Sequence, residues 1–260
     1  MTPLKTMMTR CDSHGVDGGY TKASLRFTAG SFAMCDGLVQ HMSSKESLAY
    51  FAQRDTSDSR FGTRATPLDL YVTTPPKVQE RQSLIKPNMQ VSAIRRRGGH
   101  LECIKVRWGW SPIWSVGTMP PLTHLPLHLV MRSKVFDPIK HEGRVLVPVE
   151  GWYESPAPAS PSQAQRLTYT TARQSAPIYL AALAQASETS FGCDGLALVT
   201  YGDIANQQQR VLAFSAEDAL DWLEPALGWE QAQQLAARLN GAQPPLEPAT
   251  TTQRPVQGGL

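Results

Sequence analysis

A methionine followed by a cysteine is the first feature of the sequence that could do chemistry. Met34 and Cys35 stand in the stretch SFAMCDGLVQH, thirty-odd residues into the chain. Cys35 is either an interior residue or the first residue of the working protein, once an initiator Met34 has been removed. The distinction is chemical, because a terminal cysteine carries a free amine beside its thiol and an interior cysteine has only the thiol.

A carboxylate at the end of an apolar strand is the second such feature. The run GRVLVPVEGWYES finishes in two aromatic residues, Trp152 and Tyr153, followed by Glu154. Desolvation near aromatic rings raises the pKa of a carboxyl group, which suits a general acid or base. The other interpretation is an exposed glutamate, and this short run alone favours it.

Cations and an aromatic residue gather in the run IRRRGGHLECIKVRW. Gly98 and Gly99 supply the positive φ of a tight turn between two predicted strands. The predicted hairpin brings together Arg95, Arg96, Arg97, Lys105, Arg107 and Trp108. A groove for single-stranded nucleic acid requires such a mixture of cations and rings. The alternative is a set of solvated arginines.

Half of the six tryptophans stand in the run RWGWSPIWS, around Gly109 and Pro112. Strand alternation predicts that Trp108 and Trp110 share one face, and at least one of them is expected to pack inside. Together with Trp114 they suggest a rigid aromatic platform, since stacking on bases tolerates any sequence.

The elements that must position these residues belong to a chain of 260 residues with 41% hydrophobic content, which suffices for a real core. The net charge of +3 permits an anionic partner without demanding one. The chain has no apolar run of eighteen residues, and its first thirty residues lack the apolar stretch of a secretory signal. We therefore expect a cytoplasmic protein with no membrane span and four free thiols. The cysteine spacing predicts no metal site.

Three segments can be distinguished along the chain. Residues 1–33 are polar and without periodicity, which predicts a disordered leader or sequence upstream of the real start. Residues 34–240 carry several runs with strand character, a helix signal after Ser43 and another after Ser215. Residues 241–260 are rich in proline, threonine and glutamine and are predicted to be a flexible tail. The chain is thus predicted to be an α+β protein, mainly β, with peripheral helices.

Three of these runs together resemble the SRAP family, the SOS-response-associated peptidases or abasic-site processing proteins. MCDGLVQ is similar to the family's Met-Cys-Gly-Arg-Phe start, and RWGWSPIWS to its Trp-Gly-x-x-Pro-x-Trp turn. GRVLVPVEGWYES is similar to its Arg-Cys-Leu-x-Pro-x-x-Gly-(Tyr/Phe/Trp)-(Tyr/Phe)-Glu-Trp strand. The resemblance runs from about Cys35 to Leu223, and the order and spacing of the last two motifs agree with the family.

The resemblance implies a β-barrel-like core and a reaction for the cysteine. In the family the initiator methionine is removed, and the exposed cysteine condenses with the open-chain aldehyde of an abasic site in single-stranded DNA. An amine and a thiol on adjacent carbons close a five-membered thiazolidine ring on an aldehyde. By resemblance, Cys35 is that nucleophile and Glu154 its acid/base partner, with no cofactor. We further expect peptidase-like autoprocessing, a monomer and, in a bacterium, association with the nucleoid.

This chain departs from the family's motifs at several positions. Where the family has Asn-Ala-Arg-x-Glu, ungapped matching puts His124 at the asparagine, Pro126 at the arginine and His128 at the glutamate. Arg132 is the nearest arginine that could restore a phosphate contact. Gln207 stands nearest the family's histidine, and a glutamine cannot titrate near neutral pH.

The residues beside the nucleophile depart as well. Asp36 and Gly37 stand where the family has Gly-Arg, so a cation is lost and an anion is introduced, which should raise the pKa of the thiol. His124 is either an active-site residue or a packed one, whereas His128 is interpreted as a packed or surface residue. Metal binding by these two histidines is not expected, because no carboxylate or cysteine stands at a suitable spacing.

Two other functions remain open on the sequence. One is a degenerate SRAP domain that binds single-stranded DNA without covalent chemistry. The other is a cysteine hydrolase that pairs a Cys35 thiolate with His124, which would need the thiol but no free terminal amine.

Overall fold

The computed structural model describes residues 34–42, 44–52, 70–73, 84–155, 167–172, 177–187, 194–202 and 209–241. The predicted leader at 1–33 and all but the first residue of the predicted tail at 241–260 lie outside these ranges. Gln207, Cys11 and Cys193 lie outside them too. The division into leader, domain and tail therefore stays a prediction.

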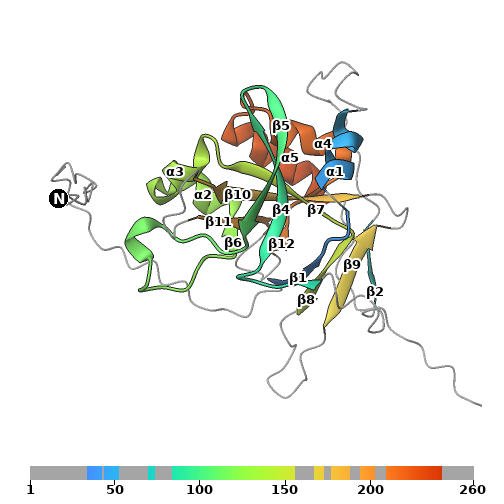
Figure 1. Ribbon diagram of the computed structural model, residues 1–260, viewed down its shortest axis with the longest axis horizontal. Helices are drawn as coiled ribbons and strands as arrows, with labels where there is room; N and C mark the ends of the chain where they lie inside the picture. The colour runs from blue at the N-terminus through green and yellow to red at the C-terminus, as the bar shows by residue number, and fades with distance from the viewer. Residues whose placement is uncertain are drawn as a thin grey trace, which may run out of the picture. The chain divides into compact units, whose positions relative to one another are not determined.

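The described strands form two sheets (Figure 1). The small sheet has five strands in the order β2 (Leu70–Thr73), β9 (Thr168–Ala172), β8 (Gly151–Ser155), β1 (Met34–Val39) and β3 (Leu84–Ile85). The main path of the eight-stranded large sheet is β12 (Arg210–Val211), β11 (Gly195–Tyr201), β10 (Ile178–Gln185), β7 (Arg144–Val149), β4 (Gln90–Arg97) and β5 (His100–Arg107). Off this path, β13 (Ala213–Phe214) pairs with β10, and β6 (His124–Pro126) pairs in parallel with β11.

The prediction of a mainly β protein is confirmed, but a barrel-like core is not supported. A barrel would need β5, at one end of the large sheet, to pair along its length with strands from the other end. Among the described residues, the chain after β5 meets β11 at an isolated bridge between Trp108 and Leu196. Gly109 follows with a φ of 143°, which takes the chain out of the extended conformation and ends the pairing.

Strand alternation divides the side chains of the large sheet between two buried layers. Along β10, Tyr179 and Leu183 point to one layer, whereas Leu180 and Ala182 point to the other. We call the second layer the inter-sheet core, because it lies between the two sheets. It includes Cys35, Leu38, Leu70, Trp152 and Ala172 from the small sheet and Val91, Val106, Trp108, Val147, Leu180, Leu198 and Val211 from the large sheet and its flank.

The helices cover the opposite face of the large sheet. They are α1 (Ser44–Ala52), α2 (Leu127–Arg132), α3 (Asp137–Lys140), α4 (Ala216–Trp222) and α5 (Trp229–Gly241). Each contributes to what we call the helix-side core, for example through Phe51, Leu127, Ile139, Trp222 and Leu235. Figure 1 shows β8 and β9 of the small sheet on the side of the large sheet away from α4 and α5. Within the described ranges, no helix is long and apolar enough to cross a membrane.

The two C-terminal helices follow their sequence signals. The Ser215 hydroxyl accepts a hydrogen bond of 3.3 Å from the backbone N–H of Asp218, as an N-cap residue should. Ala232, Leu235 and Leu239 of α5 are buried, which confirms the predicted helical period.

Arg144 ties the start of β7 to the turn between α4 and α5. Its guanidinium carbon lies 4.4 Å from the centre of the Trp229 ring and 5.2 Å from that of Trp222. One of its nitrogens donates to the carbonyl of Leu227 at 2.7 Å. Burial lowers the pKa of Arg144 to about 10.

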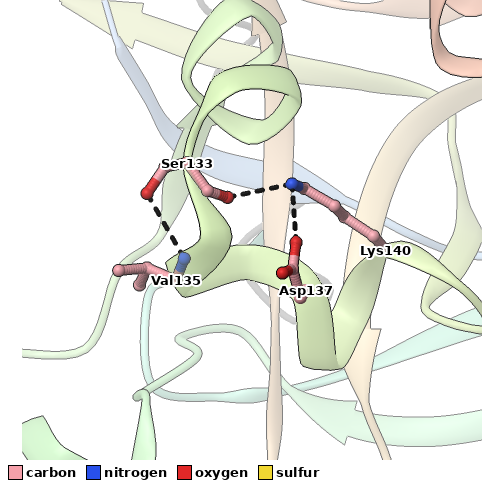
Figure 2. A network of polar contacts seen from close by, with 4 residues as sticks. All are labelled: Ser133, Val135, Asp137 and Lys140. Atoms are coloured by element: carbon pink, nitrogen blue, oxygen red, sulfur yellow. Dashed lines mark hydrogen bonds and ion pairs between the residues drawn. The ribbon is translucent and has the colours of Figure 1, made fainter. Parts of the chain in front are cut away.

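A polar network fixes the short helices that follow β6 (Figure 2). The ammonium group of Lys140 donates to the carbonyl of Ser133 at 2.9 Å and to Asp137 at 2.8 Å. The Ser133 hydroxyl accepts from the backbone N–H of Val135 at 3.3 Å, at the start of η3 (Lys134–Phe136). These contacts close the turn between α2 and α3.

Candidate functional site

Cys35 and Glu154 are cross-strand neighbours in the small sheet. The register pairs Cys35 of β1 with Glu154 of β8, and then skips one residue, so that Gly37 pairs with Tyr153. Asp36 is therefore the extra residue of a β-bulge. The bulge changes the phase of the strand, which allows Cys35 and Leu38 to face the same inter-sheet core although they stand three residues apart.

The thiol of Cys35 is buried and protonated. Cys35 is 2% exposed, and its thiol donates to the carbonyl of Gly37 at 3.6 Å. Burial raises the pKa of Cys35 well above its ordinary value, and the charges of Glu154 and Asp36 raise it further. The predicted effect of Asp36 is thus confirmed in direction, although burial is the larger cause.

The carboxyl group of Glu154 is buried, so the interpretation of an exposed glutamate is wrong. Glu154 is 3% exposed, and burial raises its pKa. Trp152, Arg210 and Thr170 lower that pKa and offset part of the rise. A carboxyl group in these surroundings can hold a proton at a higher pH than an ordinary glutamate, as a general acid must.

Arg210 is a charged neighbour of this site that sequence reasoning missed. It begins β12, a strand that contacts β1. Burial lowers the pKa of Arg210, and the charge of Glu154 raises it. The strand RVLAFS was predicted, but nothing in its pattern tells which strand of another sheet it will face.

His124 lies on the side of the large sheet that faces the inter-sheet core. Leu125 beside it belongs to the helix-side core, and the ring of His124 contacts Trp108 at 6.0 Å between ring centres. Its Nδ1 shares a hydrogen bond of 3.0 Å with the Thr123 hydroxyl, and its Nε2 is buried without a partner among the described residues. Burial lowers the pKa of His124 to about 4. No hydrogen bond in the described part of the chain joins it to Cys35.

The basic hairpin forms, but its cations divide between two faces. Alternation along β4 places Arg95 and Arg97 on one face and Arg96 on the other. Arg95 donates to Glu102, its cross-strand partner, at 2.5 Å. Arg107 donates to the carbonyl of Asp194 at 3.3 Å. The ion pair with Glu102 thus neutralises Arg95.

The three tryptophans have three different environments. Trp108 is fully buried in the inter-sheet core and Trp110 is buried in the helix-side core, so the prediction that they share a face is wrong. The φ of 143° at Gly109 breaks the alternation between them. In this conformation Trp108 cannot stack on a base. Trp114, in η2 (Ile113–Ser115), is 57% exposed and is available for stacking.

Arg132 lies apart from Cys35. It is an exposed residue in the last turn of α2, whose Leu127 and Val130 pack in the helix-side core. The structure therefore places it on the far face of the large sheet from the inter-sheet core. Burial lowers the pKa of His128, and the charge of Arg132 lowers it further.

The whole described domain matches a known family. Residues 34–252 match the SRAP family, described as SOS response associated peptidase, so the chain belongs to this family. The match begins at Met34, the first residue of β1.

Individual relatives agree with this assignment. The chain is 26% identical over 192 residues to the abasic site processing protein YedK of Escherichia coli (strain K12), covering 72% of this chain and 84% of that protein. A phage-related protein from Bordetella bronchiseptica has a similar structure, with a TM-score of 0.56, 20% identity and coverage of 78% of this chain and 88% of that chain. A protein from Bacteroides thetaiotaomicron has a TM-score of 0.53, 12% identity and coverage of 78% and 86%. These two structures support the fold alone.

Proposed function

We propose that this protein recognises abasic sites in single-stranded DNA and captures them covalently through Cys35, once that residue is the amino terminus. The observation that carries the proposal is the cross-strand pair of Cys35 and Glu154, both buried on one face of the small sheet. Membership of the SRAP family and similarity to a protein named for abasic site processing support the choice of substrate.

The reaction needs one amine, one thiol and one proton carrier. The terminal amine of Cys35 attacks the aldehyde carbon to form a carbinolamine, which loses water to give an imine. The thiol then adds to the imine carbon, and its proton ends on the ring nitrogen. One water is released, and a C–N and a C–S bond have formed. Glu154 is the group that protonates the departing hydroxyl and takes a proton back as the ring closes.

A raised pKa at both Cys35 and Glu154 suits this sequence of steps. The amine, and not a thiolate, makes the first attack, so a raised thiol pKa does not prevent it. The thiol adds in an intramolecular step, in which a high effective concentration compensates for a small thiolate fraction. A raised Glu154 pKa keeps a proton available for the loss of water.

The path of the DNA would use residues outside the buried pair. Arg95, Arg96, Arg97, Arg107, Trp114 and Arg132 remain candidates for contact with phosphates or bases. Trp114 is the strongest of them for base stacking, because it is more than half exposed. Arg132 would require the strand to reach the helix-covered face. A monomer in the cytoplasm, with removal of residues 1–34 by autoprocessing, completes the proposal.

A non-covalent DNA-binding domain is the second candidate. His124 shares no hydrogen bond with Cys35 or Glu154 among the described residues, and a glutamine stands nearest the family's histidine. A cysteine hydrolase is less favoured than either, because a buried neutral thiol without a histidine beside it is a poor nucleophile.

A denaturing gel distinguishes the first two candidates. Protein that begins at Cys35 is incubated with single-stranded DNA carrying one abasic site, and a shifted band is expected. Glu154→Gln should slow its appearance by roughly 10²–10⁴, the usual contribution of a general acid/base. Glu230→Gln, at an exposed position in α5, serves as the control. Retained binding without a shifted band in the unaltered protein would support the non-covalent candidate.

A further inference from the structure

One glutamine side chain joins the two sheets at the end of β1. Gln40 follows Val39, the last residue of that strand. Its Nε2 donates to the carbonyl of Ser92 on β4 at 3.0 Å and to the carbonyl of Pro148 on β7 at 2.7 Å. Its Oε1 accepts from the backbone N–H of Ser92 at 2.9 Å. The amide therefore uses both of its hydrogens and its oxygen on the backbone of the large sheet.

A proline in β7 explains why the large sheet accepts this amide. The antiparallel register of β4 and β7 pairs Ile94 with Leu146, and its continuation by two residues sets Ser92 opposite Pro148. Proline has no backbone N–H and cannot donate to a sheet ladder. The ladder is incomplete at this position, and Gln40 supplies the donors and the acceptor that it lacks.

Glu150 fixes the same stretch of chain from the turn between β7 and β8. Its carboxylate accepts from the backbone N–H groups of His41 at 2.9 Å and Met42 at 3.0 Å. Its own backbone N–H donates to the carbonyl of Val39 at 3.0 Å. The chain is thus held at every residue from Val39 to Met42.

The opposite end of β1 carries Cys35 and has fewer strand partners. β3 pairs with β1 at Leu38 and Val39, so among the described residues β8 is the one strand that pairs with Cys35. In a protein that begins at Cys35, no preceding chain holds this end, and chain termini are poorly ordered unless they are tied down. The register that sets Cys35 opposite Glu154 then depends on the anchored end of the same short strand.

We propose that Gln40 is a positioning residue for the capture of abasic sites, because its clamp between β1 and the large sheet holds Cys35 opposite Glu154. The inference rests on the proposed function. Gln40 acts on the amine and thiol of Cys35 through the register of β1 and not by contact with them. A displacement of reacting groups by about 1 Å can cost roughly 10²-fold in rate, so a small shift of this strand is sufficient.

The test measures capture of single-stranded abasic DNA by protein that begins at Cys35. Gln40→Met keeps the length of the side chain and removes its three hydrogen bonds. The matched control is Gln185→Met on β10, the same exchange at another half-buried glutamine, which accepts from Nε1 of Trp110 at 3.0 Å. Each exchange is measured alone and combined with Glu154→Gln, under conditions in which urea unfolding shows the variants to be folded.

Gln40→Met should lower the maximal rate of capture at saturating DNA about 10- to 100-fold and leave the half-saturating DNA concentration within about twofold. Gln185→Met should leave both quantities within about twofold. On the Gln40→Met background, Glu154→Gln should cost at least about 5-fold less than in the unaltered chain, because residues that act together have non-additive effects. An unchanged maximal rate, or additive effects of the Gln40 and Glu154 exchanges, overturns the positioning role.

A second variant separates positioning of Cys35 from stability of the sheet. Pro148→Val restores a backbone N–H opposite Ser92, so Gln40→Met combined with Pro148→Val has a repaired ladder and an unclamped β1. This double variant should capture as slowly as Gln40→Met. If it captures at the unaltered rate, Gln40 serves the sheet alone and the proposal is wrong. An unaltered protein that forms no adduct with abasic DNA overturns the proposed function itself.

Discussion

Glu154 lies directly opposite Cys35 across the β1–β8 strand pair, and both side chains are buried in the same inter-sheet core. The bulge at Asp36 creates this arrangement, because it turns Cys35 towards the core that Leu38 also occupies. Burial raises the pKa of the thiol and of the carboxyl group alike. Both groups therefore keep their protons to a higher pH than an ordinary cysteine or glutamate, and the behaviour of the pair against pH follows from that.

The stability of the protein should fall as Glu154 ionises. Its pKa is raised in the folded state, so its contribution is fully present below the unfolded value of about 4.3 and is lost as the pH rises through the folded pKa. Glu154→Gln should remove this loss, although Arg210 limits its size. Urea unfolding between pH 4 and 8 should show the variant gaining stability relative to the unaltered protein as the pH rises. A difference that stays constant with pH would contradict a raised pKa for Glu154 in the folded protein.

His124 should not titrate in the physiological range. Burial lowers its pKa to about 4, so the ring is neutral at pH 6 to 7 and cannot cause an inflection there. Release of the crosslink is expected to show no contribution from His124 across that range, and His124→Gln should leave the shape of the profile unchanged. Crosslink half-life against pH tests this. An inflection near the ordinary histidine value of about 6.5 that disappears in the variant would show that His124 is a proton carrier.

The ion pair between Arg95 and Glu102 should limit the contribution of the hairpin to DNA binding. Because Arg95 donates to Glu102, Arg95→Ala should change the salt dependence of binding little. Glu102→Gln should release the arginine and steepen the slope of log K against log salt by about 0.7, one additional phosphate contact on a single strand. Fluorescence anisotropy with abasic and intact oligonucleotides at several salt concentrations measures the slope. If Arg95→Ala flattens the slope by that amount, the arginine already contacts phosphate in spite of its pair.

Arg144 should contribute strongly to the stability of the protein on the side of the helix-side core. Its planar group contacts two tryptophan rings and donates to the carbonyl of Leu227, a geometry that an ammonium group cannot reproduce. Arg144→Lys should therefore cost about 1–3 kcal/mol of unfolding free energy. The control, Arg132→Lys on an exposed turn of α2, should stay within about 0.5 kcal/mol. Equal effects of the two exchanges in urea unfolding would refute the role of the rings.

Much of the fold follows from local patterns that the sequence displays. The alternation and apolar runs predicted β7, β10 and β11, and Ser215 predicted the start of α4. These signals are local, since a strand period or an N-cap depends on neighbours in the chain. The barrel is not supported, and the reason is non-local: closure depends on whether the chain beyond Trp108 continues along β11, and the chain leaves that strand after Gly109.

The candidate site was predictable only in part. Cys35 and Glu154 were found through the family's motifs, which give residue types but not the bulge at Asp36. Arg210 and Thr170 were missed, because they reach Glu154 from other strands and their runs carry no chemical signal. Burial likewise changed the interpretation of Trp108. Strand alternation could not predict whether this side chain is exposed, because the glycine that follows it breaks the alternation.

The most direct test of the central claim is the intact mass of the adduct. Protein that begins at Cys35 is incubated with single-stranded abasic DNA, then treated with borohydride and with iodoacetamide. We expect a species whose mass is the sum of protein and DNA less one water, unchanged by borohydride and without alkylation at Cys35, because both its amine and its thiol are in the ring. The absence of an adduct, or an adduct that borohydride reduces while the Cys35 thiol is still alkylated, would contradict thiazolidine formation.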